Sequence, residues 1–380
     1  MSKIVSISDF REEGSLLLSP TLWDETLFVR RSNRKIRCIT RCLSVHVIKA
    51  IIPQSSPHMS YQMDLSNLPE YLYQRRVYDG MRLPSGIARP AYDSALAYKP
   101  RPDDLFVVSF PKSGTTWVQY IVCLIYSEGV PPDGPIMFGA TPFLEFVGGE
   151  GVLEYEKPIP IKSHLPITHL PFHPVAKYIY VCRNPKDTLV SYYFHIKTET
   201  GCPEYVSMTM ETFFREFMEG KADWNDYYDH VIGFYQHRHD ANVLFLTYEE
   251  MKADLRSAVM EIANFMGPEY GKKLHQDKDL LDKIVQEASF RSMKEHINKS
   301  LQAAMDGKVR IPAKMRSLME ELKRVPTLQG FADFDFARKG VVGDHVNHLT
   351  AEQEEEVNRV SRERLASCPD LLHLWYEQLK

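Results

Sequence analysis

The expected fold follows from the segment Leu105-Phe-Val-Val-Ser-Phe-Pro-Lys-Ser-Gly-Thr-Thr-Trp117. Its apolar run ends at Pro111, the chain passes through Gly114, and apolar residues then recur at helical spacing from Trp117 to Ile125. This pattern predicts a buried strand, a tight turn and a helix. The first N–H groups of such a helix lack internal partners and lie at the positive end of its dipole, so the turn is suited to a phosphate or sulfate group.

The polar residues of this turn add one cation and three hydroxyl groups: Lys112, Ser113, Thr115 and Thr116. In the usual nucleoside-triphosphate loop, a lysine followed by Ser or Thr closes a longer Gly-rich span. Here the lysine comes first, and no Gly-Lys-Ser/Thr sequence follows. The turn therefore favours an anion site over ordinary ATP chemistry. The simpler alternative is a strand-turn-helix that uses Gly and Pro only to bend the chain.

The composition is that of a globular protein of one or two domains, since the 380 residues are 44% hydrophobic and 25% charged. A net charge of −4 gives no overall field for a polyanion, which argues against a nucleic-acid partner. The six cysteines form no Cys-x-x-Cys pair, which favours a reducing, cytoplasmic compartment without a disulfide framework or zinc site. No apolar run approaches the roughly 20 residues that span a bilayer, so we expect no membrane partner.

Residues 1–64 differ from the rest of the chain. Acidic residues near the start argue against a secretory signal, and a basic cluster from Arg30 to Arg41 precedes the apolar stretch Val45–Ile52. This stretch fits either an organelle-targeting or membrane-surface element or a loosely packed extension. We expect the second, with residues 1–64 outside the core and residues 65–380 as one domain.

Two further apolar runs, Lys177–Cys182 and Asn242–Tyr248, are each followed by a helical pattern. Strands that alternate with helices predict a single α/β domain with a central parallel sheet flanked by helices. Such sheets bind ligands at the carboxyl ends of their strands. Pro111, Arg183 and Tyr248 all fall at that edge.

Three segments, in order and spacing, resemble those of the cytosolic sulfotransferases. Pro111–Trp117 resembles their 5′-phosphosulfate loop, Tyr180–Tyr193 their 3′-phosphate segment, and Arg338–Asp344 their C-terminal nucleotide-binding loop. The resemblance extends from about Leu65 to Lys380. It implies a P-loop-like sulfotransferase fold and transfer of sulfonate from 3′-phosphoadenosine-5′-phosphosulfate (PAPS) to a small acceptor, leaving adenosine 3′,5′-bisphosphate (PAP). No metal is expected, because cationic side chains neutralise the donor.

The resemblance also implies which residues bind the donor. Lys112 contacts the oxygen that bridges phosphate and sulfate, where charge grows as the bond breaks. The residues implied for the 5′-phosphate are Ser113, Gly114, Thr115 and Thr116, and those for the 3′-phosphate are Arg183, Ser191, Arg338, Lys339 and Gly340. Trp117 and Phe290 are expected to sandwich the adenine near Ser289, and Tyr248 to contact the nucleotide. Each has a structural alternative, such as a strand-end ion pair for Arg183 or a core position for the aromatic residues.

The segment Ile161-Lys-Ser-His-Leu-Pro166 resembles the family's catalytic Lys-x-His segment. In a β-like stretch Lys162 and His164 project to the same face. With an ordinary pKa of about 6.5, His164 can accept the proton of the acceptor hydroxyl, while Lys162 neutralises the sulfonate. Ser191 is expected to take part in catalysis as well as in binding the 3′-phosphate. The alternative is a surface Lys-x-His before a proline.

The segment Thr141–Phe146 resembles the family's aromatic gate, so Phe143 and Phe146 are expected to line the acceptor pocket and to favour a planar phenol. His195 and Glu199 follow Arg183 on the next predicted helix. A carboxylate facing that pocket would favour a phenolic monoamine, whereas the alternative is that Glu199 faces water.

The chain departs from the family at Ala288, which replaces a Thr, and at His345, which replaces a Trp. The family's dimer motif becomes Val346–Glu355, without its leading Lys and its Val, so a homodimer by that route is in doubt. Two other functions stay open from the sequence alone. One is a P-loop kinase, and the other is a non-catalytic nucleotide binder.

Overall fold

The computed structural model describes residues 74–199, 202–309 and 339–376, a few single residues beside them, and the backbone of short strands in the first 62 residues. Those short strands are β1 (Ile4–Ser6), β2 (Leu16–Leu17), β3 (Leu27–Arg31), β4 (Arg34–Cys38) and β5 (Tyr61–Gln62). β3 pairs with β1 in parallel and with β4 antiparallel, and β2 pairs with β5 in parallel.

The described domain is built on a four-stranded sheet with the order β11-β10-β8-β9, in which every pair is parallel. Its strands are β8 (Leu105–Val108), β9 (Pro160–Ser163), β10 (Lys177–Cys182) and β11 (Val243–Thr247). Val108 pairs with Ser163 of β9 and Tyr180 of β10, while Cys182 pairs with Thr247 of β11. The predicted parallel sheet is therefore confirmed.

Alternate residues of the strands enter two separate hydrophobic cores. Phe106, Val108 and Tyr180 belong to one core, and Leu105 and Val107 belong to the other. Because successive side chains of a strand point to opposite faces, both faces of the sheet are buried. This explains why the strands are continuous apolar runs without polar alternation.

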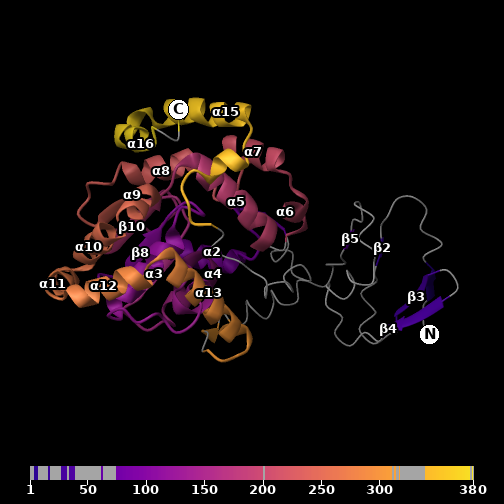
Figure 1. Cartoon of the computed structure of the whole chain (residues 1–380), viewed down its shortest axis with the longest axis horizontal. Coiled ribbons are helices and arrows are strands. Elements are labelled where there is room, and N and C mark those ends of the chain that lie inside the picture. The colour runs from indigo at the N-terminus through magenta and orange to yellow at the C-terminus, as the bar shows by residue number, and fades with distance from the viewer. Residues whose placement is uncertain are drawn as a thin grey trace.

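Helices cover both faces of the sheet (Figure 1). One core is formed with α3 (Thr115–Tyr126), α9 (Tyr248–Ala253), α10 (Leu255–Met266), α11 (Pro268–Gln276), α12 (Lys278–Glu287) and α13 (Phe290–Met305). The other is formed with α2 (Arg89–Leu96), α4 (Leu144–Val152), α5 (Pro185–Glu199), α6 (Pro203–Ser207), α7 (Met210–Met218) and α8 (Tyr227–Tyr235).

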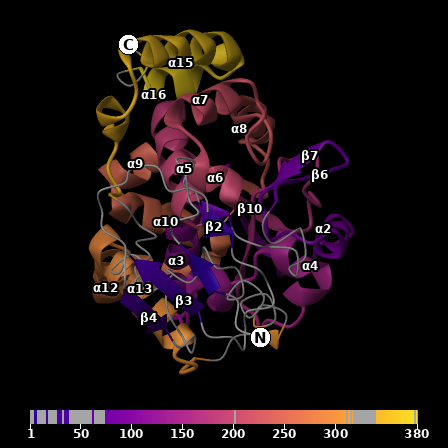
Figure 2. The same cartoon turned by 90° about the vertical axis from the view of Figure 1, so that its right-hand side faces the viewer.

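The last described elements are η7 (Asp344–Asn347), α15 (Ala351–Arg364), η8 (Leu365–Ser367) and α16 (Pro369–Leu374). Figures 1 and 2 both place α15 and α16 at one end of the molecule, beside α7 and α8. The remaining elements are the hairpin β6 (Arg76–Tyr78) and β7 (Met81–Leu83) and the π-helix η4 (Ile136–Ala140). The hairpin lies near α2 in Figure 2.

Candidate functional site

The loop between β8 and α3 has a backbone that favours glycine at its key position. Gly114 is the N-cap of α3 with φ 116°, and Lys112 has φ 66°. A Cβ atom on Gly114 would lie 3.1 Å from a ring carbon of Tyr248, so the close approach of that tyrosine also requires glycine. The backbone at Lys112 is held in a sparsely populated region, which is a common feature of binding loops.

Hydroxyl groups in this loop are buried. The hydroxyls of Ser109 and Thr115 hydrogen-bond to each other. The Oγ of Ser113 is fully buried and has no hydrogen-bond partner within the described part of the chain. A buried hydroxyl without a partner is costly, and an anion bound in the loop would satisfy it.

Arg183 follows β10 and is only 7% exposed. Its Nη2 donates to the Val341 carbonyl at 2.6 Å and lies 3.3 Å from a carboxylate oxygen of Asp187, and its guanidinium lies 4.6 Å from the Tyr248 ring centroid. Its Nε is buried, with no acceptor among the described residues. Arg183 is thus joined to the C-terminal loop while one of its donors is unsatisfied.

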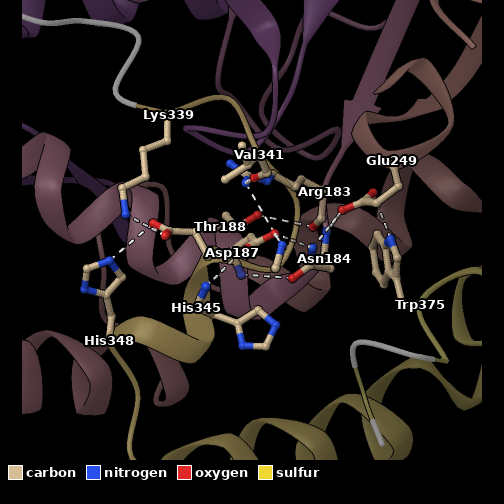
Figure 3. Close-up of polar contacts among 12 residues, drawn as sticks. Arg183, Asn184, Asp187, Thr188, Glu249, Lys339, Val341, His345, His348 and Trp375 are labelled. Carbon is tan, nitrogen blue, oxygen red and sulfur yellow. Dashed lines mark hydrogen bonds and ion pairs between the residues drawn. The ribbon is translucent and has the colours of Figure 1, made fainter. Parts of the chain in front are cut away.

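Asp187 fastens that C-terminal loop to the start of α5 (Figure 3). Its carboxylate accepts the backbone N–H of Gly343 at 2.7 Å and of His345 at 3.2 Å. It also accepts the side-chain amide of Asn184 at 3.0 Å. The 158-residue separation between Asp187 and His345 explains why sequence patterns gave no indication of this contact.

Behind Asp187 lies a second layer of polar contacts (Figure 3). Glu249 accepts from the backbone and side chain of Asn184 at 2.9 and 2.8 Å, and from the Trp375 indole at 3.0 Å. Burial raises the pKa of Glu249. Lys339, expected to contact the nucleotide, pairs with Asp344 at 2.7 Å.

Two of the aromatic residues expected to contact the nucleotide, Trp117 and Tyr248, lie 5.4 Å apart between ring centroids. The Trp117 indole donates to the Ala288 carbonyl at 2.7 Å, so Ala288 contributes its backbone there. A Cβ atom on Gly340 would overlap the Phe290 ring, which explains the glycine in the C-terminal loop. Ser289 is the N-cap of α13 and accepts from Ser292 N, so its hydroxyl has a structural role as well.

His164 follows β9 and faces two aromatic rings. Its Nδ1 lies 2.7 Å from the Ser109 carbonyl oxygen. A carbonyl only accepts, so Nδ1 carries the hydrogen, and Nε2 of the neutral ring is an acceptor. Phe143 and Trp224 lie edge-on at 5.3 and 5.4 Å between ring centroids. Burial and then the charge of Lys162 hold the pKa of His164 well below its ordinary value, so the ring is neutral at neutral pH.

Lys162 is 9% exposed, and its ammonium lies 4.0 Å from the Phe143 ring centroid. Phe146 lies 4.7 Å from Phe143, so the two predicted gate residues are adjacent. The charge of His195 on α5 also acts on the pKa of His164, which places that predicted residue near the same site.

Glu145 is a residue that the motifs did not identify. One oxygen of its buried carboxylate accepts from the Ser163 hydroxyl at 2.7 Å and from the backbone N–H of His164 and Leu165 at 2.7 and 2.9 Å. Burial raises the pKa of Glu145 to about 7. The carboxylate therefore orients the segment that carries His164, although it lies in a stretch that looks apolar.

Trp224 is also missed by sequence patterns. It has φ 69°, and its N–H donates to the Arg82 carbonyl at 2.8 Å in the β6–β7 hairpin. The preceding Asp223 is fully buried, accepts from Arg75 Nε at 3.1 Å, and is hydrogen-bonded by the Tyr205 hydroxyl. Buried polar contacts thus hold a strained residue against His164.

Four further residues singled out from the sequence belong to α5 or to the C-terminal region. Ser191 is half-buried on α5. Glu199 is the last residue of α5, but its side chain lies outside the described residues, and so does Arg338. His345 is buried, and its Nδ1 lies 2.7 Å from Glu354 on α15, so the departure from the family's Trp gives a polar link to the C-terminal helix.

Among the described residues, no group of three or more His, Cys, Asp or Glu side chains has the arrangement of a metal site. Within those residues, no helix has the length and apolar character that crossing a membrane requires.

Comparisons with known proteins agree with this geometry. The family model described as "Sulfotransferase domain" matches residues 102–369. A rabbit (Oryctolagus cuniculus) amine sulfotransferase is 36% identical over 282 residues, which cover 72% of this chain and 84% of the relative. A guinea-pig (Cavia porcellus) sulfotransferase 1E1 is 33% identical over 279 residues, or 70% and 85% of the two chains.

Among solved structures, mouse sulfotransferase SULT7A1 complexed with PAP superimposes with a TM-score of 0.61. The two chains are 27% identical, and the match covers 80% of this chain and 98% of the mouse protein. A retinol dehydratase complexed with androsterone and PAP has a TM-score of 0.57 at 22% identity, covering 73% and 86% of the two chains, and supports the fold alone.

Proposed function

Since this chain belongs to the sulfotransferase family and is a sulfotransferase, we propose that it transfers the sulfonate of PAPS to the hydroxyl of a small phenol, with His164 as the general base. The family and enzyme class expected from the three motifs are confirmed. Family membership sets aside the P-loop kinase and the non-catalytic nucleotide binder.

The donor site fits a doubly phosphorylated adenosine on two observations. The buried Ser113 hydroxyl in the loop and the buried Arg183 Nε beside the C-terminal loop both lack partners among the described residues. An anion at each point would satisfy them, and guanidinium and phosphate form strong paired hydrogen bonds. PAPS supplies the activated sulfonate. The residues proposed to hold it are Lys112, Ser113, Gly114, Thr115, Thr116, Trp117, Arg183, Ser191, Tyr248, Ser289, Phe290, Arg338, Lys339 and Gly340.

The hydrogen bond between His164 Nδ1 and Ser109 O is the observation that carries the catalytic proposal. It leaves the Nε2 lone pair to receive the acceptor proton. The low pKa of His164 keeps the ring in this form at neutral pH. Lys162, next to it, neutralises the transferring sulfonate, and Lys112 stabilises the oxygen that leaves.

Phe143, Phe146 and Trp224 make the acceptor side aromatic, which fits a planar phenol. We propose a further preference for phenolic monoamines, taken up beside Glu199 and His195 of α5. The similarity to a protein named amine sulfotransferase supports an amine-bearing acceptor, which can react at its hydroxyl or its nitrogen.

The test is turnover with labelled PAPS, using a phenolic amine and its neutral phenol analogue as acceptors. We expect sulfonated product with both acceptors and a higher kcat/KM for the amine. Glu199→Ala should reduce that ratio, because it removes the carboxylate that attracts the cation. Equal ratios in both proteins would rule out the role of Glu199 and leave the phenol activity intact. Activity should survive EDTA, since cationic side chains neutralise the donor.

A location in the cytoplasm remains a proposal, and a homodimer through the altered motif remains in doubt. The scattered cysteines support a reducing compartment. Val346, at the start of the altered dimer motif, is 63% exposed, and the motif lacks its leading Lys and its Val. Sedimentation at micromolar concentration would decide the oligomeric state.

A further inference from the structure

Lys252, in the last turn of α9, was not identified by any motif. Its ammonium nevertheless lies beside the proposed adenine site. Its Nζ is 5.8 Å from the Trp117 ring centroid and 5.4 Å from that of Phe290. These are the two rings expected to hold the adenine. Cations within about 6 Å of aromatic rings are attracted by the π face, so both rings favour an ammonium at this position.

Lys252 has no carboxylate partner among the described residues, whereas Lys339 and Lys186 each have one. Lys339 lies 2.7 Å from Asp344, and Lys186 lies 3.6 Å from Glu354. Burial and then the positive charge of Arg183 lower the pKa of Lys252. A partly desolvated cation beside another cation, with no acid to balance it, costs free energy that a bound anion would recover.

Arg183 provides the second, independent observation. It is 7% exposed, and its Nε has no acceptor in the described part of the structure. Its Nη2 is already used by Val341, at 2.6 Å. The two cations contact adjoining rings: the Arg183 guanidinium lies 4.6 Å from the Tyr248 ring centroid, and that ring lies 5.4 Å from the Trp117 ring beside Lys252. An unsatisfied guanidinium donor and an unbalanced ammonium therefore lie on the same side of the proposed donor site.

We propose that Lys252 is a further donor-binding residue, which with Arg183 binds the terminal 3′-phosphate of PAPS and PAP. This rests on the proposed donor. A phosphate monoester carries nearly two charges at neutral pH. Two cations already assigned to it have carboxylate partners, since Arg183 lies 3.3 Å from Asp187 and Lys339 lies 2.7 Å from Asp344. Arginine supplies directed paired hydrogen bonds, and lysine adds a compact point charge. Lys252 then distinguishes nucleotides that carry a 3′-phosphate from those that lack it.

The test compares PAP with 5′-AMP, which lacks the 3′-phosphate, by calorimetry on the full chain. Lys252→Met should weaken PAP binding about 10- to 100-fold, the range for a hydrogen bond to a charged group, and should change 5′-AMP binding little. Lys252→Arg should retain most of the PAP affinity. Lys272→Met, at an exposed lysine of α11, is the matched control and should bind both nucleotides as the wild type does.

A second measurement on the wild-type protein avoids dependence on folding of the variant. PAP should protect Lys252 from reductive methylation, and 5′-AMP should not. Equal protection by both nucleotides would show that Lys252 contacts the adenine, and so would equal weakening of PAP and 5′-AMP binding by Lys252→Met. Either result would overturn the proposal. Unchanged PAP binding by a folded Lys252→Met would also overturn it. If the wild type itself fails to bind PAP, the proposed donor is wrong as well.

Discussion

The hydrogen bond from His164 to the Ser109 carbonyl joins the proposed base directly to the donor loop, because Ser109 lies between β8 and Pro111. The same residue that starts the loop thus fixes the tautomer of the imidazole. On the other side, the His164 carbonyl accepts from the buried His230 imidazole at 3.0 Å. Burial lowers the pKa of His230 to about 4, so it remains a neutral donor in this position.

Removing either group that acts on the reacting atoms should slow turnover without unfolding the protein. His164→Ala should reduce kcat by about 10²–10⁴-fold through loss of the base. Lys112→Met should reduce it by about 10²–10³-fold through loss of charge stabilisation on the leaving oxygen. Steady-state kinetics with PAPS measure both, and PAP binding by His164→Ala serves as the control for an intact donor site. Near-normal kcat in either variant would contradict the role assigned to that residue.

At the scale of elements, the strand, turn and helix around Lys112 were predictable because their pattern is local. The parallel sheet also followed, since apolar runs alternate with helical ones. Glu145, Trp224 and Lys252 were not predictable. Their roles depend on partners that the fold brings together: the backbone of His164 for Glu145, the β6–β7 hairpin for Trp224, and two aromatic rings from other helices for Lys252.

The contact between Asp223 and Arg75 makes a prediction about the segment that carries Trp224. Asp223→Asn should raise the KM for the acceptor several-fold, because Arg75 loses the charge of its fully buried carboxylate partner and Trp224 is held less firmly beside His164. PAP affinity should not change. Glu204→Gln removes another Arg75 partner that is half exposed, so this control should leave KM unchanged. If both variants shift KM equally, or neither does, the positioning role of Asp223 is wrong.

At the scale of the whole molecule, the site lies where segments from distant parts of the chain meet at the carboxyl edge of the sheet. Asp187 holds the C-terminal loop against α5, and Glu249 bridges Asn184 to Trp375. We therefore expect donor binding to be coupled to the packing of the C-terminal region through these buried carboxylates. The domain boundary at residue 65 stays a prediction, because the described core begins at residue 74.

Buried titratable groups around the catalytic segment make opposite contributions to the pH dependence of stability. The pKa of His230 falls from an ordinary 6.5 to about 4 on folding, so the unfolded chain binds more protons and stability is lost as the pH falls through that window. The pKa of Glu145 rises from 4.5 to about 7, so the folded protein binds more protons and stability is lost as the pH rises from 4.5 to 7. Between pH 4.5 and 6.5 the two contributions offset each other.

Glu145→Gln should remove the contribution of Glu145 to the pH dependence of stability. The amide oxygen of the glutamine can still accept the N–H groups of His164 and Leu165. The free energy of unfolding of the variant, relative to the wild type, should then fall by about 3 kcal/mol between pH 7 and 4.5, at about 1.4 kcal/mol for each unit of pKa difference. Urea unfolding at several pH values measures this change. Glu154→Gln, at an exposed carboxylate just beyond α4, is the control and should follow the wild type. The difference in the free energy of unfolding between Glu145→Gln and the wild type could instead be constant with pH. That result would contradict the prediction, because it would mean that Glu145 has the same pKa in the folded and unfolded chain.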